Sequence, residues 1–368
     1  ARKFLESEES VKKAREVLEG EKTHDESLWK SVIEMGWTAT TIPEEFDGLG
    51  LGYLELCVIA EELGRSLAPT PFSSSVYLAT EALINLGSKE QKQIYLPKLA
   101  AGEIIGTLAH TEGTSSPSIE NLSCELKTNK LNGTKIAVTD GDVANFAVVS
   151  AKEGGKLVLC LVDLSSKGVE VTSQNTLDPS RSHASINFKN AESEILGSNE
   201  DGWVALQEIL DRAAVLFAFE QVGGSQAALD MAKAYSLERF AFGRQIGSYQ
   251  AIKHKLADMY IAVTLAKSNC YYGAWALSSE SAELPLAAAT ARVSATKAFQ
   301  LCSKENIQTL SPEFKTISPW LRSFSTHAKS IRQTQIKTGL EKAALKGRRG
   351  GRPTAQARVR VRVTDRVS

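Results

Sequence analysis

The chain has 368 residues, of which 42% are hydrophobic and 23% are charged, and its 43 basic side chains equal its 43 acidic ones. This length is enough for one large domain or two to three ordinary ones, each with a buried core. The longest apolar runs, such as residues 156–164, are much shorter than the roughly 18 to 20 residues that a transmembrane helix requires. The sequence therefore predicts no membrane-spanning segment.

Charge is divided unevenly along the chain. Residues 311–368 contain 14 Lys and Arg against 3 Asp and Glu, which leaves residues 1–310 acidic. We expect residues 311–368 to form a basic tail that is disordered or aberrant. A basic tail containing glycine can also bind nucleic acid or another anionic surface, but without a recognised binding motif we do not expect nucleic acid as the main partner.

The five cysteines lie far apart and lack C-x-x-C spacing, and the N-terminal residues show no apolar leader segment. Such cysteines are typical of reduced structural thiols rather than of a disulfide framework or a metal site. We therefore expect no metal, and a location in a bacterial cytoplasm or a mitochondrial matrix.

Helical spacing of apolar residues characterises residues 1–105. Leu28, Val32 and Met35 follow this spacing, and a loop rich in proline and glycine at residues 42–50 separates two helices. Ser88, followed three residues later by a glutamine, predicts a capped helix start. The sequence thus predicts an N-terminal helical domain over residues 1–105.

The apolar period changes from about 3.6 to about 2 residues near Gly106. Over residues 106–195, short β-rich runs alternate with turn residues, including a turn expected at residues 129–133, and no helical stretch lies between them. This pattern favours an antiparallel β-barrel or sandwich over a βαβ sheet. Helical periodicity returns over residues 200–310, so we predict an α+β multidomain protein with a helical domain, a central β domain and a C-terminal helical bundle that is truncated or altered.

Residues 239–259 contain the pattern R-x-x-F-G-x-x-I-x-x-x-Q-x-x-x-x-x-L-A-D-M. Together with the loop at residues 43–50, the pair Thr111-Glu112 and residues 305–308, this pattern resembles the acyl-CoA dehydrogenases over about residues 1–309. The resemblance implies FAD as cofactor, a helical domain, a β domain and a four-helix bundle.

The resemblance also implies which residues bind FAD. His110, Thr111 and Thr139 match segments that contact the flavin ring, and Ser116 or Ser118 would contact the pyrophosphate. The match further assigns cofactor contacts, some of them to the FAD of a neighbouring subunit, to Arg239, Phe242, Gln250 and Gln308. Without the resemblance, the threonines are ordinary strand residues and Arg239 and Gln250 are surface helix caps.

The family oxidises an acyl-CoA to the 2-enoyl-CoA, which requires a carboxylate that removes the α-proton. One position at which relatives carry this glutamate is occupied by Ala213, and the C-terminal segment that carries it in other members is not recognisable after Gln308. Glu220, two turns beyond Ala213, remains a weak candidate for the base, and Asp211 a weak candidate for a substrate contact.

Three functions therefore stay open. The chain is an FAD-dependent acyl-CoA dehydrogenase of lipid catabolism or β-oxidation, or a catalytically deficient subunit that shares FAD in a heteromeric enzyme, or a protein that binds nucleic acid or an anionic surface through its tail. The expected partners are an acyl-CoA, an electron-accepting flavoprotein and further subunits in a homodimer, a tetramer or a heterotetramer.

Overall fold

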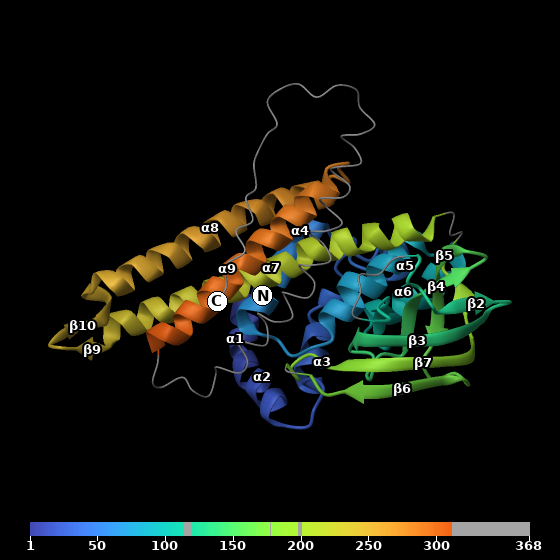
Figure 1. Cartoon of the computed structure of the whole chain (residues 1–368), viewed down its shortest axis with the longest axis horizontal. Helices are drawn as coiled ribbons and strands as arrows, with labels where there is room; N and C mark the ends of the chain where they lie inside the picture. Colours follow the sequence, from blue (N-terminus) through green and yellow to red (C-terminus); the bar gives the residue numbers. More distant parts are fainter. Residues whose placement is uncertain (114–118, 177, 198–200, 311–368) are drawn as a thin grey trace, which may run out of the picture.

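The computed structural model describes residues 1–113, 119–176, 178–197 and 201–310. Helices come first, strands follow, and long helices close the described chain, as the periodicities predict (Figure 1). The predicted tail at residues 311–368 lies outside the described residues. The N-terminal helical elements are α1 (Arg2–Ser7), α2 (Ser10–Glu19), α3 (Glu26–Glu34), η1 (Trp37–Ala39), η2 (Glu44–Phe46), α4 (Tyr53–Ser66), the π-helical segment η3 (Ser73–Thr80), α5 (Glu81–Leu86) and α6 (Lys89–Ala100).

Local sequence explains where several of these helices begin. The side chain of Asp25 accepts a hydrogen bond from the backbone N–H of Leu28 at 2.8 Å and caps α3. Ser88 and Gln91 form a reciprocal capping box at the start of α6, which confirms the predicted start. Gln91 also donates to Glu194 and to the carbonyl of Ile195, so the same residue ties α6 to the sheet.

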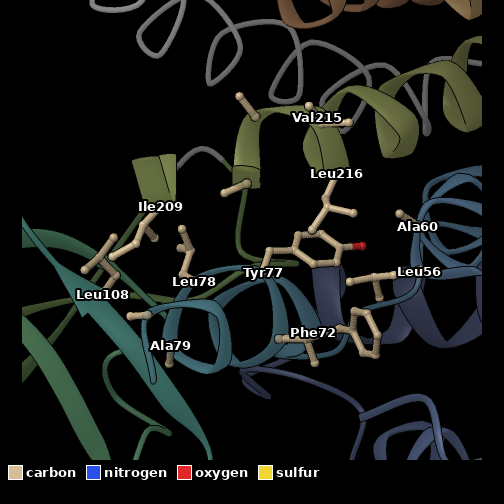
Figure 2. Packing of buried hydrophobic residues seen from close by; sticks show 14 of the residues in the cluster. Leu56, Ala60, Phe72, Tyr77, Leu78, Ala79, Leu108, Ile209, Val215 and Leu216 are labelled. Atoms are coloured by element: carbon tan, nitrogen blue, oxygen red, sulfur yellow. The ribbon is translucent and has the colours of Figure 1, made fainter. Parts of the chain in front are cut away.

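Tyr77 in η3 is the largest fully buried side chain in the described part of the chain. Its ring packs edge to face on Phe72 and on Phe217 of the long helix α7 (Gly202–Glu238), with ring centroids 5.5 Å apart in both pairs. Figure 2 shows Tyr77 between η3, α4 and α7, beside Leu56 and Leu216. This aromatic cluster joins the N-terminal helices to the C-terminal ones in one hydrophobic core.

The sheet is curled, and its strands run in the order β6-β7-β3-β2-β4-β5-β8, with β1 paired to β4 outside this path. One face of the sheet packs on the helices, and a second, separate hydrophobic cluster covers the opposite face. The strands are β1 (Gly106–Ala109), β2 (Glu125–Lys127), β3 (Lys130–Thr139), β4 (Phe146–Glu153), β5 (Lys156–Asp163), β6 (Val169–Gln174), β7 (His183–Glu192) and β8 (Glu194–Ile195).

Two details of the sheet differ from the prediction. The pairings β1–β4 and β2–β4 are parallel, so the sheet is mixed rather than purely antiparallel. The turn lies at Thr128 and Asn129, which both have positive φ, and not at residues 129–133. Strand β3 continues through Gly133, where a bulge takes up the irregularity and φ is 137°.

The helices that follow the sheet are α7, α8 (Gln250–Ser278) and α9 (Leu284–Leu310). α7 and α9 run parallel in a fixed register, since two cross-helix hydrogen bonds, Thr296 to Gln221 and Asn306 to Met231, both join residues 75 apart. Helix α4 meets α7 backbone to backbone, because a Cβ atom at Gly64 would overlap the carbonyl oxygen of Glu220.

A short hairpin connects α7 to α8. Its strands are β9 (Phe240–Ala241) and β10 (Arg244–Gln245), followed by the turn η4 (Ile246–Ser248). Phe242 and Gly243 form the tip with φ of 48° and 80°, the geometry of a tight hairpin turn. In Figure 1 this hairpin lies at the end of the long helices, away from the sheet.

None of the helices within the described residues is long and apolar enough to cross a membrane. The same part of the chain contains no group of three or more His, Cys, Asp or Glu side chains that could hold a metal ion. All five cysteines are buried free thiols.

Candidate functional site

Three of the expected flavin contacts lie along the contact between β1 and β3, with His110 and Thr111 at one end and Thr139 at the other. The backbone carbonyl of Thr111 accepts a hydrogen bond from Ile136 at 2.9 Å, and that of Thr139 accepts one from Thr107 at 2.7 Å. No hydrogen bond from the described residues reaches the half-buried hydroxyl of Thr111 or Thr139. His110 is next to Thr111, and its Nδ1 atom is buried without a partner in the described chain.

A buried ion pair holds this part of the sheet. Lys135 is fully buried, and its Nζ atom donates to Glu112 at 2.6 Å and to Ser150 at 3.0 Å. Glu112 also accepts hydrogen bonds from the N–H and hydroxyl of Ser123 and from the N–H of Cys124. Burial raises the pKa of Glu112, but these hydrogen bonds, led by that of Lys135, outweigh burial and hold the pKa below its usual value.

Burial and the positive charge of Lys135 lower the pKa of His110 to about 4. The imidazole is therefore neutral at neutral pH, with one ring nitrogen as donor and the other as acceptor. The buried pair thus fixes both the position and the charge state of the segment that carries His110 and Thr111.

A second group of expected cofactor residues lies at the hairpin and the nearby helix ends. Arg239 is the exposed C-cap of α7, Phe242 is 98% exposed at the hairpin tip, and Gln250 is the exposed first residue of α8. Exposed Gln308 lies in the last turn of α9. It belongs to the same end of the bundle as Gln250, because a 2.5 Å ion pair joins α8 and α9 one turn away, between Lys255 and Glu305.

The two groups are separate within one chain. The first lies on the sheet and the second at the far end of the helices (Figure 1). Ser116 and Ser118, the expected pyrophosphate contacts, lie outside the described residues. Asp211 is half-buried on α7, beside Arg212, which donates to Glu208 and to the hydroxyl of Tyr53.

Glu220 lies in the interior rather than on the helix surface. It is 4% exposed, and its Oε2 atom accepts a hydrogen bond from Arg181 at 2.5 Å. Arg181 also donates to Ser73 at 3.1 Å. The backbone N–H of Asp140, the residue after Thr139, donates to the carbonyl of Ser182, the residue after Arg181. The pair of Arg181 and Glu220 therefore lies close to the end of β3.

Asp140 is itself part of a buried network. Its carboxylate accepts hydrogen bonds from Ser74 at 2.6 Å and from Ser182 at 3.5 Å. Burial raises the pKa of Asp140 to about 6, although the bond from Ser74 and the charge of Arg181 oppose this shift. The network links η3, the end of β3 and the loop before β7.

Sequence reasoning missed the buried cations Lys135 and Arg292 and the half-buried Arg181. Arg181 lies in a stretch that is typical of a turn, so no local signal marks it. The sequence could have indicated Lys135, because side chains alternate between the two faces of a strand and Lys135 lies an even number of residues from buried Leu131. Ala213 is buried at 1% exposure, and the structure offers no carboxylate at that position.

Two family models match the chain. Residues 1–103 match "Acyl-CoA dehydrogenase, N-terminal domain", and residues 200–339 match "Acyl-CoA dehydrogenase, C-terminal domain". The chain is 33% identical over 265 residues to a mitochondrial isovaleryl-CoA dehydrogenase of Solanum tuberosum, covering 67% of this chain and 64% of the relative. It therefore spans less than two thirds of the length of that relative.

A longer match links the chain to the acyl-CoA dehydrogenase IpdE2 of Mycolicibacterium smegmatis. The two are 32% identical over 308 residues, which cover 83% of this chain and 82% of the relative. Among solved structures, the ChsE4-ChsE5 complex of Mycobacterium tuberculosis contains a chain with a TM-score of 0.83, 24% identity, and coverage of 95% of this chain and 96% of that one. This last likeness is one of fold.

Proposed function

Since the chain belongs to the acyl-CoA dehydrogenase family, we propose that it binds FAD and an acyl-CoA thioester and carries out α,β-dehydrogenation to the 2-enoyl-CoA. The observation that supports this most directly is the pair of half-buried hydroxyls of Thr111 and Thr139 at the two ends of the contact between β1 and β3, beside the buried Lys135–Glu112 pair. The membership of the chain in an oxidoreductase family rests on its similarity to known proteins.

The residues along the β1–β3 contact suit a flavin. A flavin ring carries hydrogen-bond acceptors and donors on one edge, and the hydroxyls of Thr111 and Thr139 and the Nδ1 atom of His110 have no partner in the described chain. Arg239 supplies a guanidinium for a pyrophosphate, and exposed Phe242 supplies an apolar face. When bound, FAD would supply the hydride acceptor that no amino-acid side chain provides.

We propose Glu220 as the proton acceptor of this chain, because Ala213 occupies a position at which relatives carry the catalytic glutamate. Accepting a substrate proton would cost Glu220 its buried ion pair with Arg181. We therefore expect slow turnover, since loss of an efficient general base typically costs about 10² to 10⁴ in rate. Asp211 remains a proposed contact on the CoA side.

The experiment is anaerobic reduction of the flavin in the purified chain by a panel of saturated acyl-CoAs, followed by absorbance. Slow bleaching supports the proposal, and its loss in Glu220→Gln would assign the base. Glu208→Gln is the matched control, because Glu208 is a half-exposed acid on the same helix. A chain that binds neither flavin nor acyl-CoA would refute the proposed function.

A second candidate function is a catalytically deficient subunit that shares FAD with an active partner chain. Ala213 and the ion-paired state of Glu220 favour it, and so does the fold likeness to one chain of a two-component complex. Retention of FAD only after co-expression with a second chain would support this candidate. Retention and rapid reduction of FAD by the isolated chain would contradict it.

The remaining partners are proposed from the resemblance alone. They are an electron-accepting flavoprotein and further subunits of a homodimer, tetramer or heterotetramer. The relatives include mitochondrial and bacterial proteins, and we propose one of these two locations for this chain. Binding of nucleic acid or an anionic surface would rest on residues 311–368, outside the described part of the chain.

A further inference from the structure

Arg292 on α9 is a buried cation without a hydrogen-bond partner. It is 5% exposed, and within the described residues its guanidinium makes no hydrogen bond and no ion pair. Its one described contact of a polar kind is with the ring of Phe217, whose centroid lies 5.2 Å from Cζ. An arginine has five N–H donors and is almost never fully buried unless it is paired.

The neighbouring carboxylate is already engaged. Glu220 forms its ion pair with Arg181, so two arginines share one buried glutamate. Burial lowers the pKa of Arg292 to about 10. The negative charge of Glu220 raises this pKa, and the positive charge of Arg181 lowers it further. Arg292 is therefore still charged at neutral pH. A further buried acid, Asp140, acts on Arg181 from the side of Ser74 and Ser182.

A second polar group lies nearby. The hydroxyl of Tyr77 is buried beside Glu220, and the ring of Tyr77 packs on Phe217. The region keeps a connection to solvent, because Phe217 is half-buried and the side chain of Arg181 is 20% exposed. Polar groups from η3 and α9 thus converge here, beside Glu220 of α7.

This region lies next to the proposed reaction site. On α7, Phe217 is one turn beyond Ala213, and Glu220 is two turns beyond it, or about 10 Å along the helix. A ligand whose thioester lies near Ala213, and whose acyl chain extends along α7 in this direction, would bring the far end of that chain to Arg292.

We propose that Arg292 binds a carboxylate at the far end of the acyl chain, so that this protein selects ω-carboxyacyl thioesters over unsubstituted ones. A carboxylate matches the planar fork of a guanidinium and neutralises the excess positive charge of the two arginines. An apolar chain end would leave Arg292 buried and unpaired, which is costly. The inference rests on the proposed function, because it assumes that acyl thioesters bind at this site.

The test is binding of CoA thioesters to the full chain purified with its flavin, measured by calorimetry. Adipyl- and suberyl-CoA are compared with hexanoyl- and octanoyl-CoA, which have the same chain lengths without the carboxylate. A charge-assisted pair predicts about 10- to 100-fold tighter binding of the carboxylated ligands. Arg292→Met should abolish this preference, Arg292→Lys should retain part of it, and the exposed Arg15→Met should leave it unchanged.

A second measurement separates ligand recognition from a structural role. Because Arg292 is unpaired, Arg292→Met should raise the unfolding temperature of the ligand-free protein. A lower unfolding temperature, or failure of this variant to fold, would overturn the inference and assign Arg292 a structural partner. Equal affinity of wild type for both ligand series would also overturn it while the proposed function stands. Absence of binding of every thioester would refute both.

Discussion

Replacing Glu112 by glutamine should destabilise the sheet more than replacing its partner Lys135 by methionine. The reason is the difference in burial between the two side chains. Lys135 is fully buried, so without Glu112 its charge has only the hydroxyl of Ser150 as a partner. Glu112 is 10% exposed and keeps three hydrogen bonds, from Ser123 and Cys124, when Lys135 is removed.

These contacts set the magnitudes. An uncompensated buried charge costs about 3 to 5 kcal/mol, which we expect for Glu112→Gln. Loss of one charge-assisted hydrogen bond from a carboxylate that keeps its other hydrogen bonds costs about 1.5 to 3 kcal/mol, which we expect for Lys135→Met. The double variant should be more stable than Glu112→Gln alone, because it contains no orphaned charge.

Hydrogen exchange of the β3 amides measures the free energy of opening this part of the sheet. Lys130→Met is the control on the same strand, since the pair of Lys130 with Glu192 is exposed and is worth about 1 kcal/mol or less. If Glu112→Gln costs no more than Lys135→Met, burial does not control this pair and the reasoning is wrong.

Three further predictions concern the hairpin and the core. Arg239→Ala should weaken FAD retention by about 10- to 100-fold with little effect on unfolding, and unchanged retention would remove Arg239 from the cofactor site. Phe242→Gly should stabilise the chain by about 1 kcal/mol, because Phe242 is 98% exposed at positive φ, while weakening FAD retention; a loss of stability in urea unfolding would refute this. Burial raises the pKa of Glu81 from an ordinary value of 4.5 to about 7, against the hydrogen bonds of Tyr53 and Asn85. The native state thus binds the extra proton, so wild type should lose stability as pH rises from about 4.5 to about 7, and Glu81→Gln should show a smaller loss over that range.

The sequence predicted those features that depend on local patterns. The order of helices, strands and helices follows from the change of apolar period at Gly106 and near residue 200. The capping box at Ser88 depends on residues three apart and is confirmed. The family assignment came mainly from one continuous stretch, residues 239–259, and the comparisons confirm it.

The features that were not predicted depend on pairs far apart in the chain. Arg181 and Glu220 are 39 residues apart, and only the packing of the loop before β7 on α7 brings them together. The parallel pairing of β1 with β4 joins residues 40 apart and leaves no mark on either strand. Arg292 gave no signal either, because a cation in an Ala-rich helix is ordinarily a surface residue.

Helix α7 has a consequence for how a cofactor would assemble with this protein. Arg239 lies 19 residues beyond Glu220, which is about 28 Å of straight helix, and the hairpin continues away from the sheet (Figure 1). If both groups of residues serve FAD, the sheet of one chain and the hairpin of another must meet around each cofactor. The fraction of sites that hold FAD would then depend on the concentration of the protein as well as on that of FAD. Diluting the protein at constant free FAD should therefore release the flavin.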